Sequence, residues 1–297
     1  MTTPILNPTR PSTPTTAEDS ARAAAPRRRA WPTPPGSPPD ARATARAAAF
    51  SLTGITVFLA AWHLAAQQGW LSPIAPTPNG VWTRAVDLVG DPFYRTGPAS
   101  VGMFWHLLAS LQRVLVGFAI ATAVAVPLGL LTGLHPTLRR ATEPVVQVLR
   151  PVSPLAWLPL GLALLRDAEH TAIFVIVFTA VWPTLLATAE AVRTIPPTYL
   201  HLAATLGTSR LSTLVHVIIP ATLPGIATGL RLSLSTSWLV IIAAEMLVGG
   251  RGMGFFLWNM WNRLDTDAIV VAILIIGATG FALDTVVNRL TKVIRYA

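Results

Sequence analysis

The sequence predicts an all-α integral membrane protein with six transmembrane helices. Of its 297 residues, 52% are hydrophobic and only 12% are charged, whereas soluble domains carry roughly 25% charged residues. Six apolar segments also approach the about 20 residues that a helix needs to cross the hydrocarbon layer. These segments are 48–66, 109–133, 145–165, 171–189, 224–247 and 268–287.

The segment 1–46 differs from the remainder, 47–297, which holds all six spans. It is rich in Pro, Ala, Thr and Arg and has almost no large apolar side chains. It therefore cannot bury enough surface to offset the entropy lost on folding, and we expect a disordered tail. Nucleic-acid binding is one interpretation of its seven arginines, but their place ahead of a span favours a cytoplasmic anchor. A signal peptide is disfavoured because the basic run 27–29 lies about twenty residues before the apolar core, instead of beside it.

The basic residues near the ends of the spans predict the orientation. Six crossings put both termini on one side of the membrane. Twelve basic residues fall on that side: Arg27, Arg28, Arg29, Arg42, Arg46, Arg139, Arg140, Arg193, Arg210, Arg289, Lys292 and Arg295. Five fall on the other: Arg84, Arg95, Arg166, Arg251 and Arg263. Because cytoplasmic connections carry the excess of Lys and Arg, both termini are expected in the cytoplasm.

Several kinds of chemistry are excluded by what the sequence lacks. There is no cysteine, which excludes disulfides, thiolate metal sites and cysteine nucleophiles. The one lysine, Lys292, stands outside any Gly-x-x-x-x-Gly-Lys-Ser/Thr pattern, and neither His-Glu-x-x-His nor Gly-x-Ser-x-Gly occurs. We therefore expect no catalytic residue, cofactor or metal in this chain. Any ATP hydrolysis would take place on another polypeptide.

Residues 194–220, within the polar connection 190–222, predict two short amphipathic helices. Pro197 suits the first turn of the first helix, and Gly207 suits its left-handed C-terminal cap. Ser209 can cap the second helix, which Pro220 would stop. The expected apolar faces are Tyr199, Leu202, Ala203 and Leu206, then Leu211, Leu214, Val215 and Ile218. Such a long connection in a membrane protein indicates a docking surface for a soluble partner, although an inert loop is the alternative.

Two further features belong to the predicted outer side. Asn79 can cap a short helix that ends at Gly90 and lies flat on the interface. Its apolar residues are Val81, Trp82, Ala85, Leu88 and Val89. Glycines at 249, 250, 252 and 254 precede Phe255, Phe256, Trp258 and Trp261, as in an interfacial aromatic belt. A phosphate-binding glycine loop is the other interpretation, but no strand context or lysine supports it.

The 194–220 segment resembles the loop of inner-membrane permeases of binding-protein-dependent ABC importers. That loop has Glu-Ala-Ala, three residues, Gly, nine residues and Ile-x-Leu-Pro. Here His201-Leu202-Ala203 is followed by Gly207 and by Val217-Ile218-Ile219-Pro220 at the same separations. His201 stands in place of the glutamate, which removes the family's acidic group at that position. The resemblance implies that Tyr199, His201, Leu202, Ala203, Leu206, Gly207 and Pro220 form an ATPase-coupling loop.

The resemblance covers roughly 48–295 and narrows to permeases for nitrate, bicarbonate, cyanate, sulfonates and taurine. It is carried by the segment 150–159, Pro220-Ala221-Thr222, Thr228-Gly229-Leu230-Arg231 and Ala243-Ala244-Glu245-Met246-Leu247, and it is greatest for nitrate permeases. It implies a type I importer fold, a permease homodimer in the bacterial inner membrane, two ATPase subunits that bind ATP and Mg²⁺, and an extracytoplasmic solute-binding protein. A sulfonate or taurine importer has the same architecture.

Polar groups inside the spans suggest where a solute would pass. Charges in the bilayer are costly, so they face protein or water. We expect Arg150, Ser153, Trp157, Arg231 and Glu245 to line a translocation pathway, with Arg150 and Arg231 attracting an anion. The alternative is that the arginines reach the headgroups and Glu245 forms a structural ion pair. Arg113 is expected to be an interfacial anchor. Prolines at 151, 154 and 159 should break the third span and require an interior position.

Two other classes of function stay open at the level of sequence. A secondary transporter or channel would work without partner subunits, but such folds often carry paired broken helices in repeated halves. No convincing repeat occurs here. A membrane scaffold without transport is less compatible with the charges and prolines in the spans.

Overall fold

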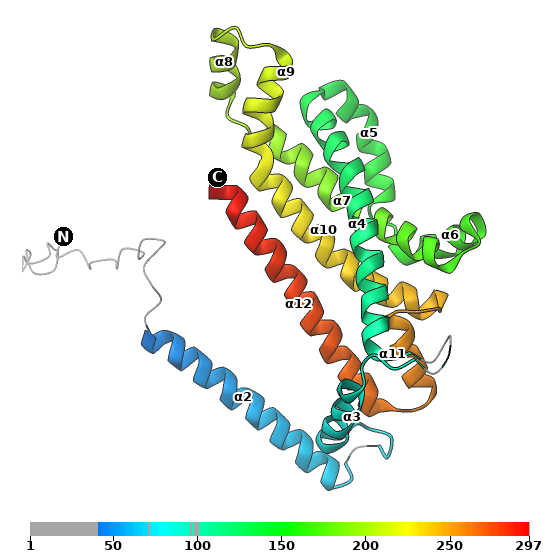
Figure 1. Cartoon of the computed structure of the whole chain (residues 1–297). Helices are drawn as coiled ribbons and strands as arrows, with labels where there is room; N and C mark the ends of the chain where they lie inside the picture. Colours follow the sequence, from blue (N-terminus) through cyan, green and yellow to red (C-terminus); the bar gives the residue numbers. More distant parts are fainter. Residues whose placement is uncertain (1–40, 71, 96, 98–100, 297) are drawn as a thin grey trace, which may run out of the picture. The chain divides into compact units, whose positions relative to one another are not determined.

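The computed structural model describes residues 41–70, 72–95, 97 and 101–296, whose regular elements are all helices (Figure 1). The all-α prediction is thus confirmed for the described part of the chain. In chain order the elements are α2 (Ala41–Gln67), α3 (Pro78–Gly90), α4 (Met103–Leu134), α5 (Pro136–Leu149), η1 (Pro154–Trp157), α6 (Leu158–Leu165), α7 (Ala168–Arg193), α8 (Pro197–Thr205), α9 (Arg210–Thr213), η2 (Leu214–Ile218), α10 (Ile219–Val248), α11 (Met253–Asn262) and α12 (Thr266–Tyr296).

Helix α2 begins earlier than the sequence predicted. Most of the expected disordered tail, 1–40, lies outside the described residues, but 41–46 belong to the helix. Alanine predominates from Ala41 onward, and its helix propensity extends the helix ahead of the apolar segment. The chain divides into two compact units, 1–57 and 58–297, and the second holds all the helices from α3 to α12.

Among the described residues, five helices are long and apolar enough to cross a membrane, and the expected third span differs from them. The five are Thr44–Gln67, Met103–Leu134, Ala168–Arg193, Arg210–Val248 and Thr266–Arg289. In place of a straight helix over 145–165, α5 and the pair η1 and α6 meet at an angle of 90°. The three prolines explain the break, since each removes a backbone donor and disfavours a continuous helix.

The packing of α4 on α7 shows that this bent segment must return the chain across the bundle. Gly117, Gly129 and Gly133 of α4 lie against Ile176, Thr188 and Val192 of α7. Later residues of α4 contact later residues of α7, so the two helices run parallel. They approach closely because the glycines of α4 have no side chain. Since α4 and α7 point the same way, the residues between them must cross back. Counted as one span, the bent pair brings the candidate spans of the described residues from five to six.

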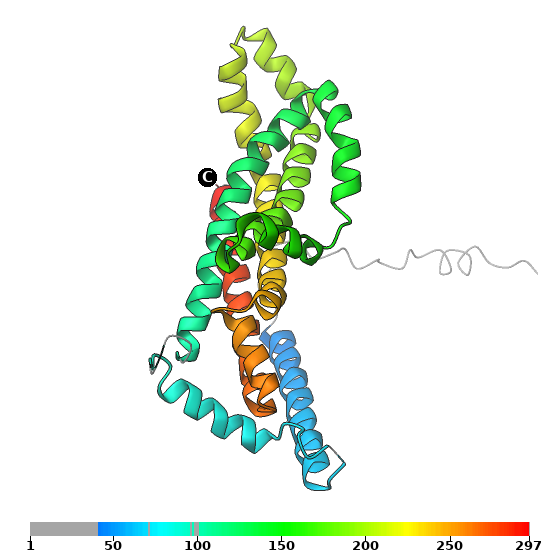
Figure 2. The same ribbon diagram turned by 90° about the vertical axis from the view of Figure 1, so that its right-hand side faces the viewer.

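Helix α7 occupies the centre of the bundle (Figure 2). It packs against α4 on one side and α10 on the other. Gly225 and Gly229 of α10 approach Ala191 and Ala187, and Ser233 Oγ donates to the Ala180 carbonyl oxygen at 2.9 Å. These pairs show that α10 is antiparallel to α7. Helix α12 in turn is antiparallel to α10, because the Trp238 indole donates to the Ile276 carbonyl while Arg231 reaches Asp284.

An aspartate begins α7. The Asp167 carboxylate accepts the backbone N–H of His170 at 2.8 Å and contacts the His170 ring at 2.6 Å. The bond from the His170 N–H, followed by the side-chain bond, stabilises the charged carboxylate and lowers the pKa of Asp167. Asp167 is therefore an N-cap whose charge favours the start of α7.

Helix α3 is capped by Thr77, not by Asn79 as predicted. Pro78 takes the first helical position, and the Thr77 hydroxyl accepts the Gly80 N–H at 3.1 Å. Arg84 fixes the helix to the start of α12 through Asp265, at 2.6 Å. Its packed side consists of Val81, Ala85 and Leu88, whereas Trp82 and Val89 of the predicted face are exposed. The expected contact with the membrane interface stays a prediction.

Candidate translocation and coupling sites

The two short helices predicted within 194–220 are present as α8 and α9, at one end of the bundle (Figure 1). Helix α8 ends at Thr205, and Gly207 takes the left-handed conformation expected of it, with φ of 66°. Ser209 caps α9, since its hydroxyl accepts the Ser212 N–H at 3.2 Å. These local turns were readable from the sequence because each depends on a residue with special backbone or capping properties.

Pro220 does not stop the second helix, which corrects the prediction. The π-helical segment η2 joins α9 to α10, and one continuous helix covers Arg210–Val248. A wider turn just before Pro220 relieves the clash of its ring with the carbonyl of His216. The loop is therefore connected directly to a helix that crosses the bundle, so a displacement of α9 can be passed to α10.

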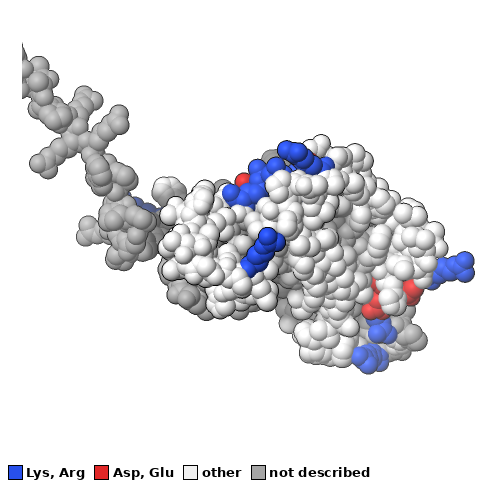
Figure 3. All heavy atoms as spheres, turned by 90° about the horizontal axis from the view of Figure 1, so that it is seen from above, with Lys and Arg blue, Asp and Glu red and all other residues white. Residues whose placement is uncertain are grey.

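The apolar positions of α8 are divided between the bundle and the surface. Ala203 is buried, whereas Tyr199, Leu202 and Leu206 are exposed by 52%, 57% and 70%. His201 is exposed as well. Seen from this end, the surface is mostly uncharged, with basic side chains at separate places (Figure 3). Three large apolar side chains, two in α8 and one at its C-cap, are thus exposed instead of packing on the bundle, as a docking surface requires.

At the opposite end of the bundle, Arg113 of α4 and Glu245 of α10 form a buried ion pair. Arg113 Nη1 lies 2.8 Å from Glu245 Oε1, and the two residues are 7% and 1% exposed. Arg113 is therefore not the interfacial anchor that the sequence predicted. Glu245, predicted to line the pathway, faces the interior and lines none of the three pockets described below. A paired and hydrogen-bonded charge of this kind can be held in a low-dielectric interior.

The ion pair belongs to a network that fixes the start of α11. Ser110 Oγ lies 2.8 Å and 2.9 Å from the two oxygens of Glu245 and accepts the Met253 N–H at 2.8 Å. The Gly254 N–H donates to Glu245 at 3.1 Å, and the Gly252 N–H donates to His106 Nδ1 at 3.1 Å. Side chains from α4 and α10 thereby satisfy backbone donors at the N-terminus of α11.

Arg231 has a partner that the sequence analysis did not name. Its Nε and Nη2 atoms donate to the two carboxylate oxygens of Asp284 on α12, each at 2.7 Å. Arg231 also lines a pocket of about 500 Å³ with Thr228 and Asn288. An aspartate in an apolar span was itself a signal, because an intramembrane carboxylate needs a partner.

Arg150, at the end of α5, is the one predicted pathway charge with no partner among the described residues. Its side chain is exposed and forms no hydrogen bond or ion pair there. Ser153 follows it at the break and its side chain caps no helix. The Trp157 ring in η1 packs in a tilted arrangement against Phe178 of α7, with ring centroids 4.4 Å apart. In the single chain, this segment is not interior as predicted, since only Leu158 and Gly161 of α6 are buried. Local turns satisfy some of the backbone groups of this segment; for example, the Ala156 N–H donates to the Ser153 carbonyl oxygen at 3.0 Å.

Two pockets meet at Arg150, each of about 570 Å³. The α5–α7 pocket is lined by Thr132, Arg139, Thr142, Glu143, Val146, Gln147, Arg150, Pro151, Leu185, Leu186, Ala189, Glu190 and Arg193. The α7–α10 pocket is lined by Arg150, Val152, Pro154, Phe178, Thr179, Trp182, Pro183, Leu186, Ala187, Leu232, Thr236 and Val240. The second pocket has no carboxylate among its lining residues. Sequence reasoning missed Trp182 and Thr236, because their spans carry no local mark of a pocket.

Residues 125–296 match the family model described as a binding-protein-dependent transport system inner membrane component. The chain belongs to this family. The permease is 43% identical to the nitrate import permease protein NrtB of Leptolyngbya laminosa, over 78% of this chain and 82% of the relative. It is 40% identical to the bicarbonate transport system permease protein CmpB of Synechocystis, over 81% and 86%, and 30% identical to the taurine permease TauC of Escherichia coli, over 82% and 87%.

The fold is similar to that of a solved importer. The permease superposes on a chain from the inward-facing methionine ABC transporter MetNI with a TM-score of 0.53 and 16% identity, covering 63% of the permease and 93% of that chain. The predicted type I importer fold is thereby confirmed. The protein is a multi-pass transport subunit of an ABC importer in the nitrate and bicarbonate branch, not its ATPase. Such a system also comprises an ATPase and a solute-binding protein.

Proposed function

We propose that this permease carries a small monovalent oxyanion, nitrate in the first place, into the cytoplasm. The observation that carries the proposal is the state of Arg150. Of the three predicted pathway charges, Arg231 is paired with Asp284 and Glu245 with Arg113, whereas the exposed Arg150 side chain has no partner among the described residues. It stands where the α5–α7 and α7–α10 pockets meet. A guanidinium at such a junction attracts an anion and matches a planar oxyanion geometrically.

The similarity to nitrate permeases supports nitrate, and the similarity to bicarbonate permeases makes bicarbonate the second candidate. Both anions are planar and carry a single negative charge, so one guanidinium suits either. The taurine permease TauC is 30% identical to this chain, against 43% for the nitrate permease and 40% for the bicarbonate permease. Sulfonates are therefore the weaker alternative.

Movement of the anion would be driven through α8 and α9. In this proposal two copies of the permease form a homodimer, and an ATPase subunit binds each loop at the exposed Tyr199, Leu202 and Leu206. ATP and Mg²⁺ bind to the ATPase subunits and to no site in this chain. Closure of the ATPase subunits displaces the loops, and the continuous helix from α9 to α10 transmits the displacement to the pockets. Both termini would then face the cytoplasm, on the same side as the loops.

Uptake by the complete transporter tests the proposal. The permease, its ATPase and its binding protein are reconstituted in proteoliposomes, and uptake of labelled nitrate is measured with and without ATP. We expect ATP-dependent nitrate uptake that excess bicarbonate reduces less than excess unlabelled nitrate does. Preferential uptake of labelled bicarbonate or taurine would assign the substrate differently. Full nitrate flux without the ATPase would contradict the importer mechanism.

A further inference from the structure

The α5–α7 pocket lies at the end of the bundle that carries α8 and α9, beyond Arg150. Five charged residues line it. Arg139, Arg150 and Arg193 are basic, while Glu143 and Glu190 are acidic, so the formal charge of the lining is 3 − 2 = +1. One monovalent anion would neutralise the pocket.

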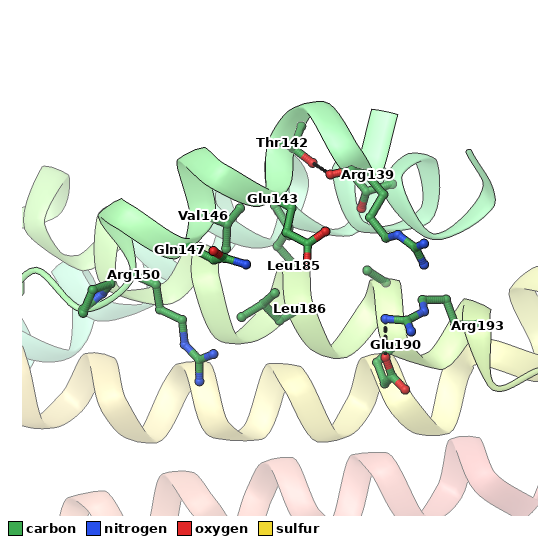
Figure 4. Close-up of a pocket in the computed structure, with 13 residues that line it drawn as sticks. Arg139, Thr142, Glu143, Val146, Gln147, Arg150, Leu185, Leu186, Glu190 and Arg193 are labelled. Atoms are coloured by element: carbon green, nitrogen blue, oxygen red, sulfur yellow. Dashed lines mark hydrogen bonds and ion pairs between the residues drawn. The ribbon is translucent and has the colours of Figure 1, made fainter. Parts of the chain in front are cut away.

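The three arginines of this pocket lie at two places: Arg139 and Arg193 are near each other, and Arg150 is apart from them. Figure 4 shows the Arg139 side chain, from α5, and the Arg193 side chain, from α7, extending toward one another across the pocket. Arg193 is held by Glu190 at 3.0 Å, whereas Arg139 has no partner among the described residues. Arg150 follows Arg139 by eleven residues, which corresponds to about 16 Å along a helix. Arg139 and Arg193 therefore lie together at one end of the pocket, and Arg150 lies at the other end.

We propose that Arg139 and Arg193 form a second anion site, on the exit side of the pathway, for the monovalent oxyanion that leaves Arg150. The substrate class rests on the proposed function. Glu190 offsets part of the charge of Arg193, whereas the charge of Arg139 is not offset by a partner among the described residues. An anion between the two guanidinium groups gains a charge-assisted contact with each. A planar oxyanion can accept a hydrogen bond from each. The Glu190 contact keeps Arg193 extended into the pocket, so part of the ordering cost is met before the anion arrives.

Glu143 adjusts which anion this site prefers. Its carboxylate lies between Arg139 and Arg150 along α5 and projects into the same pocket (Figure 4). Nitrate has only acceptor oxygens and is repelled by the carboxylate. Bicarbonate has one O–H group, which can donate to it. Replacing Glu143 by glutamine should therefore strengthen nitrate binding and should give bicarbonate a smaller gain or a loss.

Anion binding to the purified, full-length permease in nanodiscs tests the inference, with sodium nitrate as the probe and calorimetry as the readout. We expect nitrate binding that Arg139→Gln and Arg193→Gln each weaken by about tenfold, since each removes one charge-assisted contact. Arg140→Gln is the matched control, because Arg140 is the exposed neighbour of Arg139 and does not line the pocket. Glu143→Gln should tighten nitrate binding, and thermal unfolding identifies any variant that has lost its fold.

Equal nitrate affinities of Arg139→Gln, Arg193→Gln and Arg140→Gln, or no binding by the folded wild type, would overturn the inference. The proposed function fails separately. Arginine-dependent nitrate binding without ATP-driven nitrate uptake would leave this site in place and remove the proposed substrate. Normal nitrate uptake, with nitrate binding unaltered in Arg139→Gln and Arg193→Gln, would keep nitrate as the substrate and remove the second anion site.

Discussion

The carboxylate of Glu245 and the guanidinium of Arg113 lie 2.8 Å apart in the interior, on two antiparallel helices. Ser110 and the backbone of Gly254 also bond this carboxylate. The arrangement joins α4, α10 and α11 at the end of the bundle opposite to α8 and α9. Because both charges are almost fully buried, each depends on the other for its stability in the folded chain.

Glu245→Gln leaves the Arg113 guanidinium buried without its counter-charge. We expect the variant to be less stable by about 3 kcal/mol, measured by thermal or denaturant unfolding in detergent. Arg113→Gln combined with Glu245→Gln should recover part of this loss, since neither buried charge is then left alone. Additive losses in the double variant would refute the coupling of the two residues.

Gly252→Ala tests the close approach of the loop to the same carboxylate. Gly252 has φ of 139°, and a Cβ atom there would overlap the Glu245 side chain. We expect destabilisation of about 2 kcal/mol from strain and displacement of the ion pair. Gly277→Ala is the control, since a Cβ at Gly277 in α12 meets no atom within 4 Å. It should be neutral or stabilising by up to about 1 kcal/mol, because alanine is the better helix former.

Gly207→Pro should uncouple the transporter. Proline cannot adopt the φ of 66° found at Gly207, so α8 and α9 would lose their relative orientation. We expect ATP-dependent uptake to fall by more than about tenfold while the protein still inserts. Gly207→Asn should retain most uptake, because asparagine tolerates this backbone conformation and open space surrounds the position. Equal uptake by the two variants would show that the turn plays no part in coupling.

The Asp167 cap predicts a pH dependence of stability. Hydrogen bonds from His170 lower the pKa of Asp167, so the folded state favours the charged carboxylate. The cap therefore stabilises α7 above the pKa of the unfolded aspartate, and this contribution is lost as the pH falls through the lowered folded value. The melting temperature of Asp167→Asn should lie below that of the wild type at neutral pH and approach it in acid. A pH-independent difference would contradict the electrostatic part of this explanation.

Features that depend on neighbouring residues could be predicted from the sequence. The apolar lengths predicted six spans, five of which are single helices. The prolines at 151, 154 and 159 predicted the break in the third span, and Gly207 predicted its own backbone conformation. Pro220 was misjudged because a π-turn accommodates it, and the choice of turn depends on how α9 meets the bundle. Likewise, Thr77 replaced Asn79 as a cap because Pro78 favours the earlier start.

Features that depend on distant residues could not be predicted in this way. Arg113 looked like an interfacial anchor because the sequence does not show that Glu245, 132 positions away, lies beside it. Asp284 was overlooked as the partner of Arg231 for the same reason. The pockets that meet at Arg150 arise where α5, α7 and α10 come together, and their uncharged lining residues resemble any other residues of a span.

In the proposed mechanism, a monovalent oxyanion passes Arg150 when the ATPase displaces α8 and α9. ATP-dependent nitrate uptake by the complete transporter in proteoliposomes, compared between Arg150→Gln and Arg166→Gln, tests it most directly. Arg166 is an exposed arginine at the end of α6 that lines none of the three pockets. We expect Arg150→Gln to reduce uptake by at least about tenfold, as the loss of one charge-assisted contact to the solute predicts, and Arg166→Gln to leave it unchanged. Equal uptake by the two variants would contradict the account.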